Sequence, residues 1–393
     1  MTADAAAARK AGDVPVTPFD AAKLDRLLEE EGIDAVVVSS KPNIQYLLGG
    51  YRFFFFDHFD AIGPSRYLPL LVYMKGHAER SAYIGNPMEA YERDLGRFWV
   101  PKIEPRSRGS VDAMRIAVEH LKSLGRIRRI GVERAFLPAD AEAALREGMA
   151  GAEIVEAWSP LERLRAVKTP AELALIREAS ERVVDAMLAV MSAHGPGATK
   201  RELVQALRRE EVGRGLVFEY CLITAGTSLN RAPSDQRWNA GEILSIDSGG
   251  NYGGYIGDLC RMAIHGEPDA ELSDMLSEVD AIQQAARKPI RHGATGAEVY
   301  AVAGEVHRRS PNANSIEFVA HGMGLVSHES PRLTYSRQDM DKPLEAGMVL
   351  SIETTLAHRQ RGFIKLEDTV AVTGEGWQAF GDSGRGWNRG GAG

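Results

Sequence analysis

The chain has 393 residues with a net charge of -7 at neutral pH. This length favours two domains, and the acidic and basic residues are interspersed without a basic stripe, which argues against nucleic acid or an anionic membrane as partner. Two cysteines, no apolar run of spanning length and no apolar signal-peptide core at the N-terminus lead us to expect a soluble cytoplasmic protein.

The first 160 residues alternate between short apolar runs and helical patterns. Residues 1–16 are Ala-rich and polar, and we expect them to be disordered. Strand-like runs lie at 34–39, 70–73, 81–84 and 130–132, and helix-like stretches lie at 21–31, 43–48, 111–124 and 139–149. This alternation predicts a small α/β domain over residues 17–160.

The segment after residue 160 begins with a helix signal. Thr169-Pro170-Ala171-Glu172 combines a capping residue, a proline in the first turn and an acid near the positive end of a helix. Helices are expected from there to about 192, then over 200–213, 269–288 and 295–309. We place a second domain at 161–383, followed by a Gly-rich tail at 384–393 that has no means of building a core.

A Gly-rich stretch, SIDSGGNYGGYIGDLCR at 245–261, puts two carboxylates on apolar strands. Residues 243–247 and 255–260 are predicted to be strands, and the four glycines between them are predicted to form a turn. If the strands pair as a hairpin, Asp247 and Asp258 lie on one face, where two close anions repel unless a cation separates them.

Three further candidate ligands occupy apolar surroundings downstream. His321 lies in EFVAHGMGL, Glu353 in MVLSIETT and Glu367 in GFIKLEDTVAV. The two glutamates bracket a polar turn at 358–362, as the two aspartates bracket theirs. This weak internal repeat would gather four carboxylates and one imidazole around one centre if the two hairpins pack together.

Such a set is difficult to explain as purely structural, because burying each ionised carboxylate would cost several kcal/mol. Two divalent cations would roughly neutralise the four charges, and an oxygen-rich set with one nitrogen suits Mn, Co, Zn or Fe. A pair of such ions activates water and polarises a carbonyl group. The residues therefore predict metal-assisted hydrolysis of an amide-like bond.

The same residues resemble those of the metallopeptidases with the pita-bread fold, which include methionine aminopeptidase, Xaa-Pro aminopeptidase, prolidase and creatinase. The resemblance covers most of the chain, and its N-terminal part is similar to the creatinase and prolidase branch. It is carried by the segments LRAVKTPAELALIREA, SIDSGGNYGGYIGDLCR, HGMGL, SHESP, SIETT and IKLED. The expected fold is therefore α+β: an N-terminal creatinase-like α/β domain, then a pita-bread domain with a pseudo-twofold antiparallel sheet and covering helices.

The resemblance also implies a role for each ligand. Asp247 would hold one ion, His321 and Glu353 the other, and Asp258 and Glu367 would bridge the two. Glu353 would take a proton from the attacking water, and His328 would stabilise charge on the carbonyl oxygen of the scissile bond.

The resemblance further implies a homodimer. In that arrangement the aromatic run 51–58 (YRFFFFDH), with Phe54 and Phe55, would line the neighbouring subunit's pocket. The alternative interpretation is that the run packs in the core or at an interface.

Three positions depart from the family pattern. Asn230 lies near the place of a histidine that peptidases of the family usually carry, and Thr354-Thr355 replaces a Pro-Gly pair. Lys365 stands where an arginine often precedes the last glutamate. These changes indicate a shifted substrate, whereas metal binding should survive them.

The predicted function is that of a dinuclear metal-dependent hydrolase of a small peptide or amide, with an Xaa-Pro dipeptidase or aminopeptidase as the leading form and manganese among the candidate metals. One alternative is a creatinase-like hydrolase or lyase acting on a small non-peptide metabolite, since fold does not determine function. Another is a non-catalytic binding protein of the same fold, although such a protein would be expected to lose its ligands.

Overall fold

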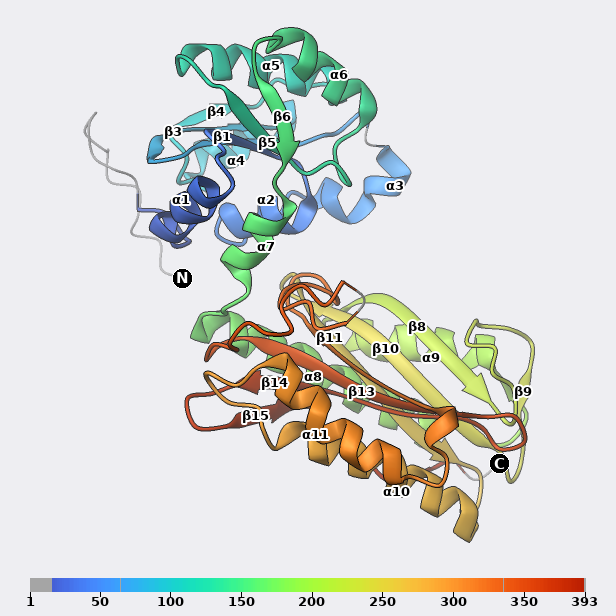
Figure 1. Cartoon of the computed structure of the whole chain (residues 1–393). Coiled ribbons are helices and arrows are strands. Elements are labelled where there is room, and N and C mark those ends of the chain that lie inside the picture. Colours follow the sequence, from blue (N-terminus) through green and yellow to red (C-terminus); the bar gives the residue numbers. More distant parts are fainter. Residues whose placement is uncertain (1–15, 64, 335, 392–393) are drawn as a thin grey trace. The chain divides into compact units, whose positions relative to one another are not determined.

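The structure is a computed structural model that describes residues 16–63, 65–334 and 336–391. The predicted disorder of residues 1–16 concerns a segment that, apart from Val16, lies outside these ranges. Two compact units comprise Met1–Arg165 and Ala166–Gly393 (Figure 1). The helix α7 (Trp158–Arg165) ends the first unit, so the division follows this helix, whereas the sequence places it near 160.

The N-terminal unit is built on a six-stranded mixed sheet with the order β4-β3-β2-β1-β5-β6. β1 pairs antiparallel with β2 and parallel with β5. The strands are β1 (Ala35–Val38), β2 (Leu70–Met74), β3 (His77–Ile84), β4 (Lys102–Glu104), β5 (Arg129–Val132) and β6 (Glu153–Glu156).

Helices cover both faces of this sheet, which explains why its central strands β1 and β2 are apolar throughout. Val36 and Val38 belong to one core cluster, and Ala35 and Val37, which alternate with them, belong to another. The helices are α1 (Ala21–Glu30), α2 (Lys41–Leu47), α3 (Phe59–Ile62), α4 (Ala90–Asp94), α5 (Ser110–Ser123) and α6 (Ala139–Gly148), with short 3-10 helices η1 (Phe54–His58) and η2 (Pro87–Glu89).

The aromatic run at 51–58 divides between the core and the surface. Phe53 and Phe56 are buried, and both rings make contacts with Tyr67. Phe54 is 49% exposed. Core packing thus accounts for Phe53 and Phe56. The role of Phe54 at a neighbouring subunit stays a prediction.

The C-terminal unit contains an eight-stranded sheet whose central order, β12-β13-β14-β11-β10-β8, is symmetric about the contact between β14 and β11. Each half has three antiparallel strands preceded in the sequence by two helices, which is the predicted internal repeat. The strands are β8 (Val217–Ala225), β10 (Ile243–Tyr252), β11 (Tyr255–Ile264), β12 (Ile316–Gly322), β13 (Val349–His358), β14 (Gly362–Val372), β15 (Trp377–Phe380) and β16 (Asn388–Arg389). A separate small sheet pairs β7 (Ala198–Thr199) with β9 (Arg237–Trp238).

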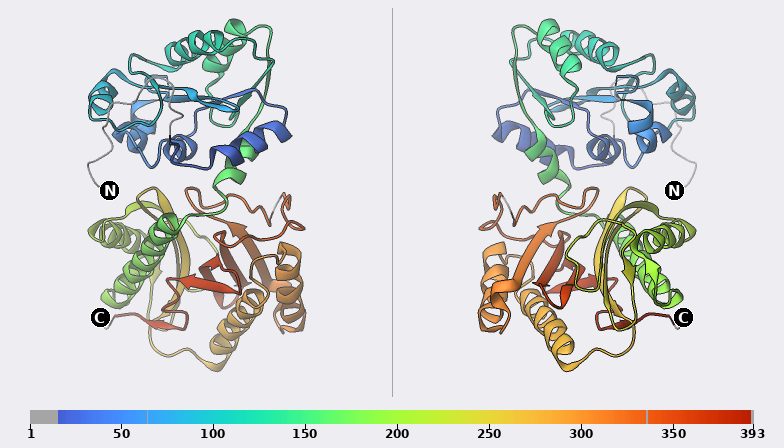
Figure 2. Two further views of the ribbon diagram at one scale, coloured as in Figure 1. Left: turned by 90° about the vertical axis from the view of Figure 1, so that its left-hand side faces the viewer. Right: turned by 90° about the vertical axis from the view of Figure 1, so that its right-hand side faces the viewer.

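Four helices flank these strands, with α8 (Pro170–Ala193) and α9 (Lys200–Gly213) beside one half and α10 (Ala270–Arg287) and α11 (Gly296–Arg309) beside the other (Figure 2). Thr169, Thr199 and Thr295 cap their helices through capping boxes, each with a glutamate three residues on. A short 3-10 helix, η3 (Ala313–Ser315), precedes β12. Across the described ranges, no helix is both long and apolar enough to cross a membrane.

Two details of the C-terminal unit differ from expectation. Gly249 and Gly250 lie inside β10, so only Gly253 and Gly254 form the turn of the first hairpin. A glycine is needed at 249 because a Cβ there would lie 2.4 Å from the ring of Tyr220. The tail from 384 also takes part in the fold, since β16 adds to β11 and Trp387 packs on the core.

Candidate metal centre

Four site-facing side chains form a row across the middle of the C-terminal sheet. Asp247 on β10 pairs with Cys260 on β11, Cys260 pairs with Glu367 on β14, and Glu367 pairs with Glu353 on β13. Directly opposed residues point to the same face of a sheet. Leu366 and Ile352, which alternate with the two glutamates, belong to the core cluster shared with α10 and α11. The carboxylates therefore occupy the face away from these helices.

Asp258, His321 and Glu367 come close enough to share a metal ion. Each offers a ligand atom within 4.8 Å of the other two, and all three side chains are buried. His321 Nε2 lies 3.8 Å from Glu367 Oε1 and has no hydrogen-bond partner among the described residues. An orphaned imidazole nitrogen aimed at two carboxylates is a donor set suited to a divalent cation, so these residues fit a metal ion.

Lys365 links the other two predicted ligands. Its Nζ lies 2.7 Å from Asp247 Oδ2 and 2.7 Å from Glu367 Oε2, and it also forms an ion pair with Glu353. The guanidinium of Arg231 forms a further ion pair with Asp247. Asp247 and Glu353 thus belong to the same cluster, but here a lysine ammonium connects them.

The cluster is short of positive charge. Burial and the neighbouring carboxylates Glu367 and Asp247 hold the pKa of Asp258 well above its usual range. Burial and Glu367 likewise raise the pKa of Glu353. Burial alone would raise the pKa of Glu367, but Lys365 and His321 outweigh it and lower that pKa. A cation beside Asp258 would relieve this repulsion.

Two neutral side chains hold members of the cluster in position. The Tyr220 hydroxyl hydrogen-bonds to Asp258, and its ring covers Gly249. The Ser351 hydroxyl donates to Glu367 Oε1 over 2.8 Å. These contacts orient the carboxylates that a metal would need.

His328 stacks on His321, with ring centroids 3.7 Å apart and an interplanar angle of 16°. Burial and the adjacent His321 lower the pKa of His328 to about 4, so its imidazole is neutral at neutral pH. The next residue, Glu329, forms a buried ion pair with Lys168 at 2.9 Å, which fixes this segment. His328 is thus placed beside the cluster as a neutral hydrogen-bonding group.

Asn230 lies in an exposed turn. Its Oδ1 accepts a hydrogen bond from the Ala232 N–H over 2.9 Å, and its carbonyl accepts one from Lys200. The side chain therefore serves the turn, and its neighbour Arg231 reaches Asp247.

Sequence reasoning overlooked the part played by Lys365, Arg231, Tyr220 and Ser351. Two of these residues could have been identified from the alternation of side chains along a strand. Lys365 and Ser351 each lie two residues before a predicted ligand, so they share its face of the sheet. Arg231 and Tyr220 follow no such pattern, because their positions depend on how a loop and the strand β8 approach β10.

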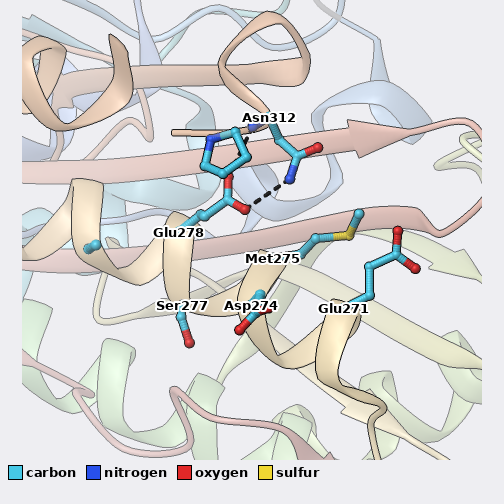
Figure 3. Close-up of a pocket in the computed structure, with 8 residues that line it drawn as sticks. Glu271, Asp274, Met275, Ser277, Glu278 and Asn312 are labelled. Carbon is cyan, nitrogen blue, oxygen red and sulfur yellow. Dashed lines mark hydrogen bonds between the residues drawn. The ribbon is translucent and has the colours of Figure 1, made fainter. Parts of the chain in front are cut away.

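A surface pocket lies elsewhere, on α10 and the segment before η3 (Figure 3). Its lining includes Glu271, Asp274, Met275, Ser277, Glu278 and Asn312. Glu278 accepts hydrogen bonds from the Asn312 backbone and side chain and from Ser310, so this carboxylate has a structural role. None of the eight residues drawn is a predicted site residue, and the pocket is separate from the cluster.

Two family descriptions match the chain. Residues 21–167 match the Creatinase/Prolidase N-terminal domain, and residues 174–374 match Metallopeptidase family M24. The second match spans about half of the chain and contains all five predicted ligands.

Relatives and solved structures agree with these matches along nearly the whole length. The uncharacterized peptidase YqhT of Bacillus subtilis is 23% identical over 90% of this chain and 95% of its own. The Xaa-Pro dipeptidase of Pyrococcus horikoshii is 24% identical over 90% of this chain and 94% of its own. The structure of an Xaa-Pro dipeptidase from Bacillus anthracis superposes with a TM-score of 0.79 at 21% identity, covering 92% of this chain and 97% of that one. This last likeness supports the fold.

Proposed function

Because this chain belongs to metallopeptidase family M24, a family of hydrolases, we propose that it cleaves short peptides with the Xaa-Pro dipeptide as the leading substrate. The observation that carries the proposal is the buried cluster of Asp258, His321 and Glu367, with an orphaned imidazole nitrogen. Relatives named Xaa-Pro dipeptidase, which cover nearly the whole chain, support the substrate class.

The ligand set of the proposal comprises Asp247, Asp258, His321, Glu353 and Glu367. Divalent ions held there, Mn, Co, Zn or Fe, would polarise the scissile carbonyl and lower the pKa of a water. We take two ions per chain as the complete centre. A homodimer in the cytoplasm remains part of the same proposal.

The remaining chemistry belongs to side chains of the chain itself. Glu353, at the end of the carboxylate row, is assigned to take the proton of the attacking water. His328 is assigned to donate a hydrogen bond to the carbonyl oxygen, and its low pKa keeps it neutral for that purpose. Tyr220 and Ser351 orient the carboxylates to which they hydrogen-bond.

An activity panel tests this function. The chain loaded with Mn²⁺, Co²⁺ or Zn²⁺ is assayed against Xaa-Pro dipeptides, longer peptides and small N-substituted amides, with Asp258→Asn and His321→Ala as matched variants. We expect Xaa-Pro hydrolysis that requires metal, and a loss of about a thousandfold or more in kcat/KM in both variants. Metal binding without hydrolysis of any member of the panel would contradict the enzymatic proposal.

One observation favours a second candidate, chemistry on a small non-peptide metabolite. Asn230 is engaged in a turn and an amide cannot act as an acid, so the chain supplies no protonatable group at this position. Cleavage of the N-substituted amides, with none of the Xaa-Pro set, would select this candidate.

A further inference from the structure

Lys365 is enclosed by the metal-ligand cluster. It precedes Glu367 by two residues on β14, so its side chain extends over the same face, and the residue is 3% exposed. Its ammonium contacts the carboxylates of Asp247, Glu367 and Glu353. An ammonium has three N–H donors, and here three different carboxylates surround it. The lysine therefore occupies the place between carboxylates that a cation would take.

Arg231 adds a second built-in cation on the same side. Its guanidinium forms an ion pair with Asp247 and lies over the ring of Phe363, 5.0 Å from the centroid. Asp247 thus already has two cationic partners within the chain. Asp258, by contrast, makes no ion pair with any residue that the structure describes, and its hydrogen bond comes from Tyr220.

The charges of the cluster are therefore unevenly distributed. When all four carboxylates are ionised they carry four negative charges, and Lys365 and Arg231 carry two positive ones, which leaves two negative charges when the histidines are neutral. The uncompensated part lies at Asp258 with His321 and Glu367. One divalent ion at that place would balance the charge of the cluster.

We propose that the Lys365 ammonium occupies the second metal position, so that one divalent ion binds beside Asp258 directly and a second binds only by displacing Lys365. The inference rests on the proposed function, because it concerns the metal centre of that enzyme. A displaced ammonium must leave three carboxylates and find water or another partner, and this opposes the second ion. Lys365 thus controls the number of ions that the chain holds at a given metal concentration.

Metal titration tests the proposal without any substrate. The metal-free full chain is titrated with Mn²⁺, bound ions are counted by elemental analysis, and free Mn²⁺ is followed by electron paramagnetic resonance. We expect the wild type to bind one ion tightly and a second with at least tenfold weaker affinity. In Lys365→Met, which keeps an unbranched side chain one atom shorter and removes its charge, the second ion should bind at least tenfold more tightly than in the wild type.

Lys365→Arg is the matched control, since it retains the positive charge and should leave the second ion weakly bound. Two ions of equal affinity in the wild type would overturn the proposal, as would a second site that Lys365→Met leaves unchanged. If Lys365→Met does not fold, wild-type crystals soaked in Mn²⁺ give the same decision. Two ions with the Lys365 ammonium displaced would support the proposal, and two ions with it still bound to the three carboxylates would overturn it.

Failure of the proposed function gives a different result. A wild-type chain that binds none of Mn²⁺, Co²⁺, Zn²⁺ and Fe²⁺ would refute the metalloenzyme itself. A chain that binds two equal ions and hydrolyses Xaa-Pro dipeptides would refute only the role of Lys365.

Discussion

Glu211 on α9 is a buried carboxyl group that contacts the hairpin of β10 and β11, which carries Asp247 and Asp258. Its Oε1 accepts a hydrogen bond from the Ser248 hydroxyl over 2.7 Å, and Oε2 finds no hydrogen-bond partner among the described residues. Burial raises the pKa of Glu211 to about 8. The group is therefore largely protonated at neutral pH. Asp247, which precedes Ser248 on β10, faces the opposite side of the sheet.

This pKa makes the stability of the C-terminal unit depend on pH. The folded state retains the Glu211 proton up to about pH 8, whereas the unfolded chain releases it near 4.5. The free energy of unfolding attributable to this group therefore falls as pH rises through that window and levels off above it. We expect Glu211→Gln to stabilise the protein by roughly 2–4 kcal/mol at pH 9 and to have little effect near pH 4.5. Denaturant unfolding of the wild type and the variant at both pH values measures this change in stability. An equal change at the two pH values would contradict the prediction.

Residue types in apolar strands allowed the candidate ligands to be named from the sequence. Asp258, His321 and Glu367 do gather, because a carboxylate or imidazole inside an apolar run seldom occurs without a partner. The intrusion of Lys365 was not predicted. A lysine in a strand normally extends to solvent, and only the three carboxylates around this one make its burial tolerable.

Among the secondary-structure elements, α8 and β11 approach each other closely at Gly257. A Cβ at Gly257 would lie 2.6 Å from the backbone nitrogen of Ser180 and 2.7 Å from the carbonyl carbon of Ala179. The strand therefore approaches the helix backbone directly. Gly257 precedes Asp258, so this contact also determines the position of a predicted ligand.

A single methyl group should disturb that contact. We expect Gly257→Ala to destabilise the protein by about 3 kcal/mol and to weaken Mn²⁺ binding, because β11 must move away from α8. Gly213→Ala, at the end of α9 where nothing lies within 4 Å, is the control and should be neutral or slightly stabilising. Thermal unfolding and Mn²⁺ titration of both variants check the prediction. Equal behaviour of the two would show that the sheet accommodates the methyl group.

Helices were easier to predict than strand ends. Capping boxes at Thr169, Thr199 and Thr295 mark three helix starts by chemistry that is local in the sequence. The extension of β10 through Gly249 depends on Tyr220 from β8, a contact that no local pattern signals.

On the scale of the whole molecule, a buried ionic network ties the chain's last described segment to the C-terminal core. Asp368 is fully buried between Arg261 and Arg287, each at 2.9 Å, and it also forms an ion pair with Arg385. Arg385 further pairs with Asp280 on α10. This segment follows the last predicted ligand and closes over the strand that bears it.

Removing one cation from this network should weaken the fold. We expect Arg385→Ala to lower the free energy of unfolding by about 2 kcal/mol, less than for an isolated buried pair because two arginines still balance Asp368. Arg389→Ala is the matched control, since its ion pair with Glu267 is exposed and should contribute within about 0.5 kcal/mol. Unfolding of both variants in guanidinium chloride measures the difference. The prediction is wrong if the two substitutions lower the free energy of unfolding equally.

The two-domain arrangement could be predicted because the two parts of the sequence have different patterns. The first part alternates between strands and helices, and the second part carries two hairpins with carboxylates. The part played by residues 384–391 could not. A Gly-rich segment has few side chains to signal burial, and its order comes from strand pairing with β11 and from Arg385.

The symmetric strand order has a consequence for biosynthesis. Asp247 and Asp258 come from one half of the sheet, and Glu353 and Glu367 come from the other. A nascent chain that has emerged only to residue 340 would contain both aspartates and His321 but neither glutamate. The proposed centre therefore cannot be completed until the second half has been made and has docked on the first. We accordingly expect a chain that is still being translated through that half not to hydrolyse peptides.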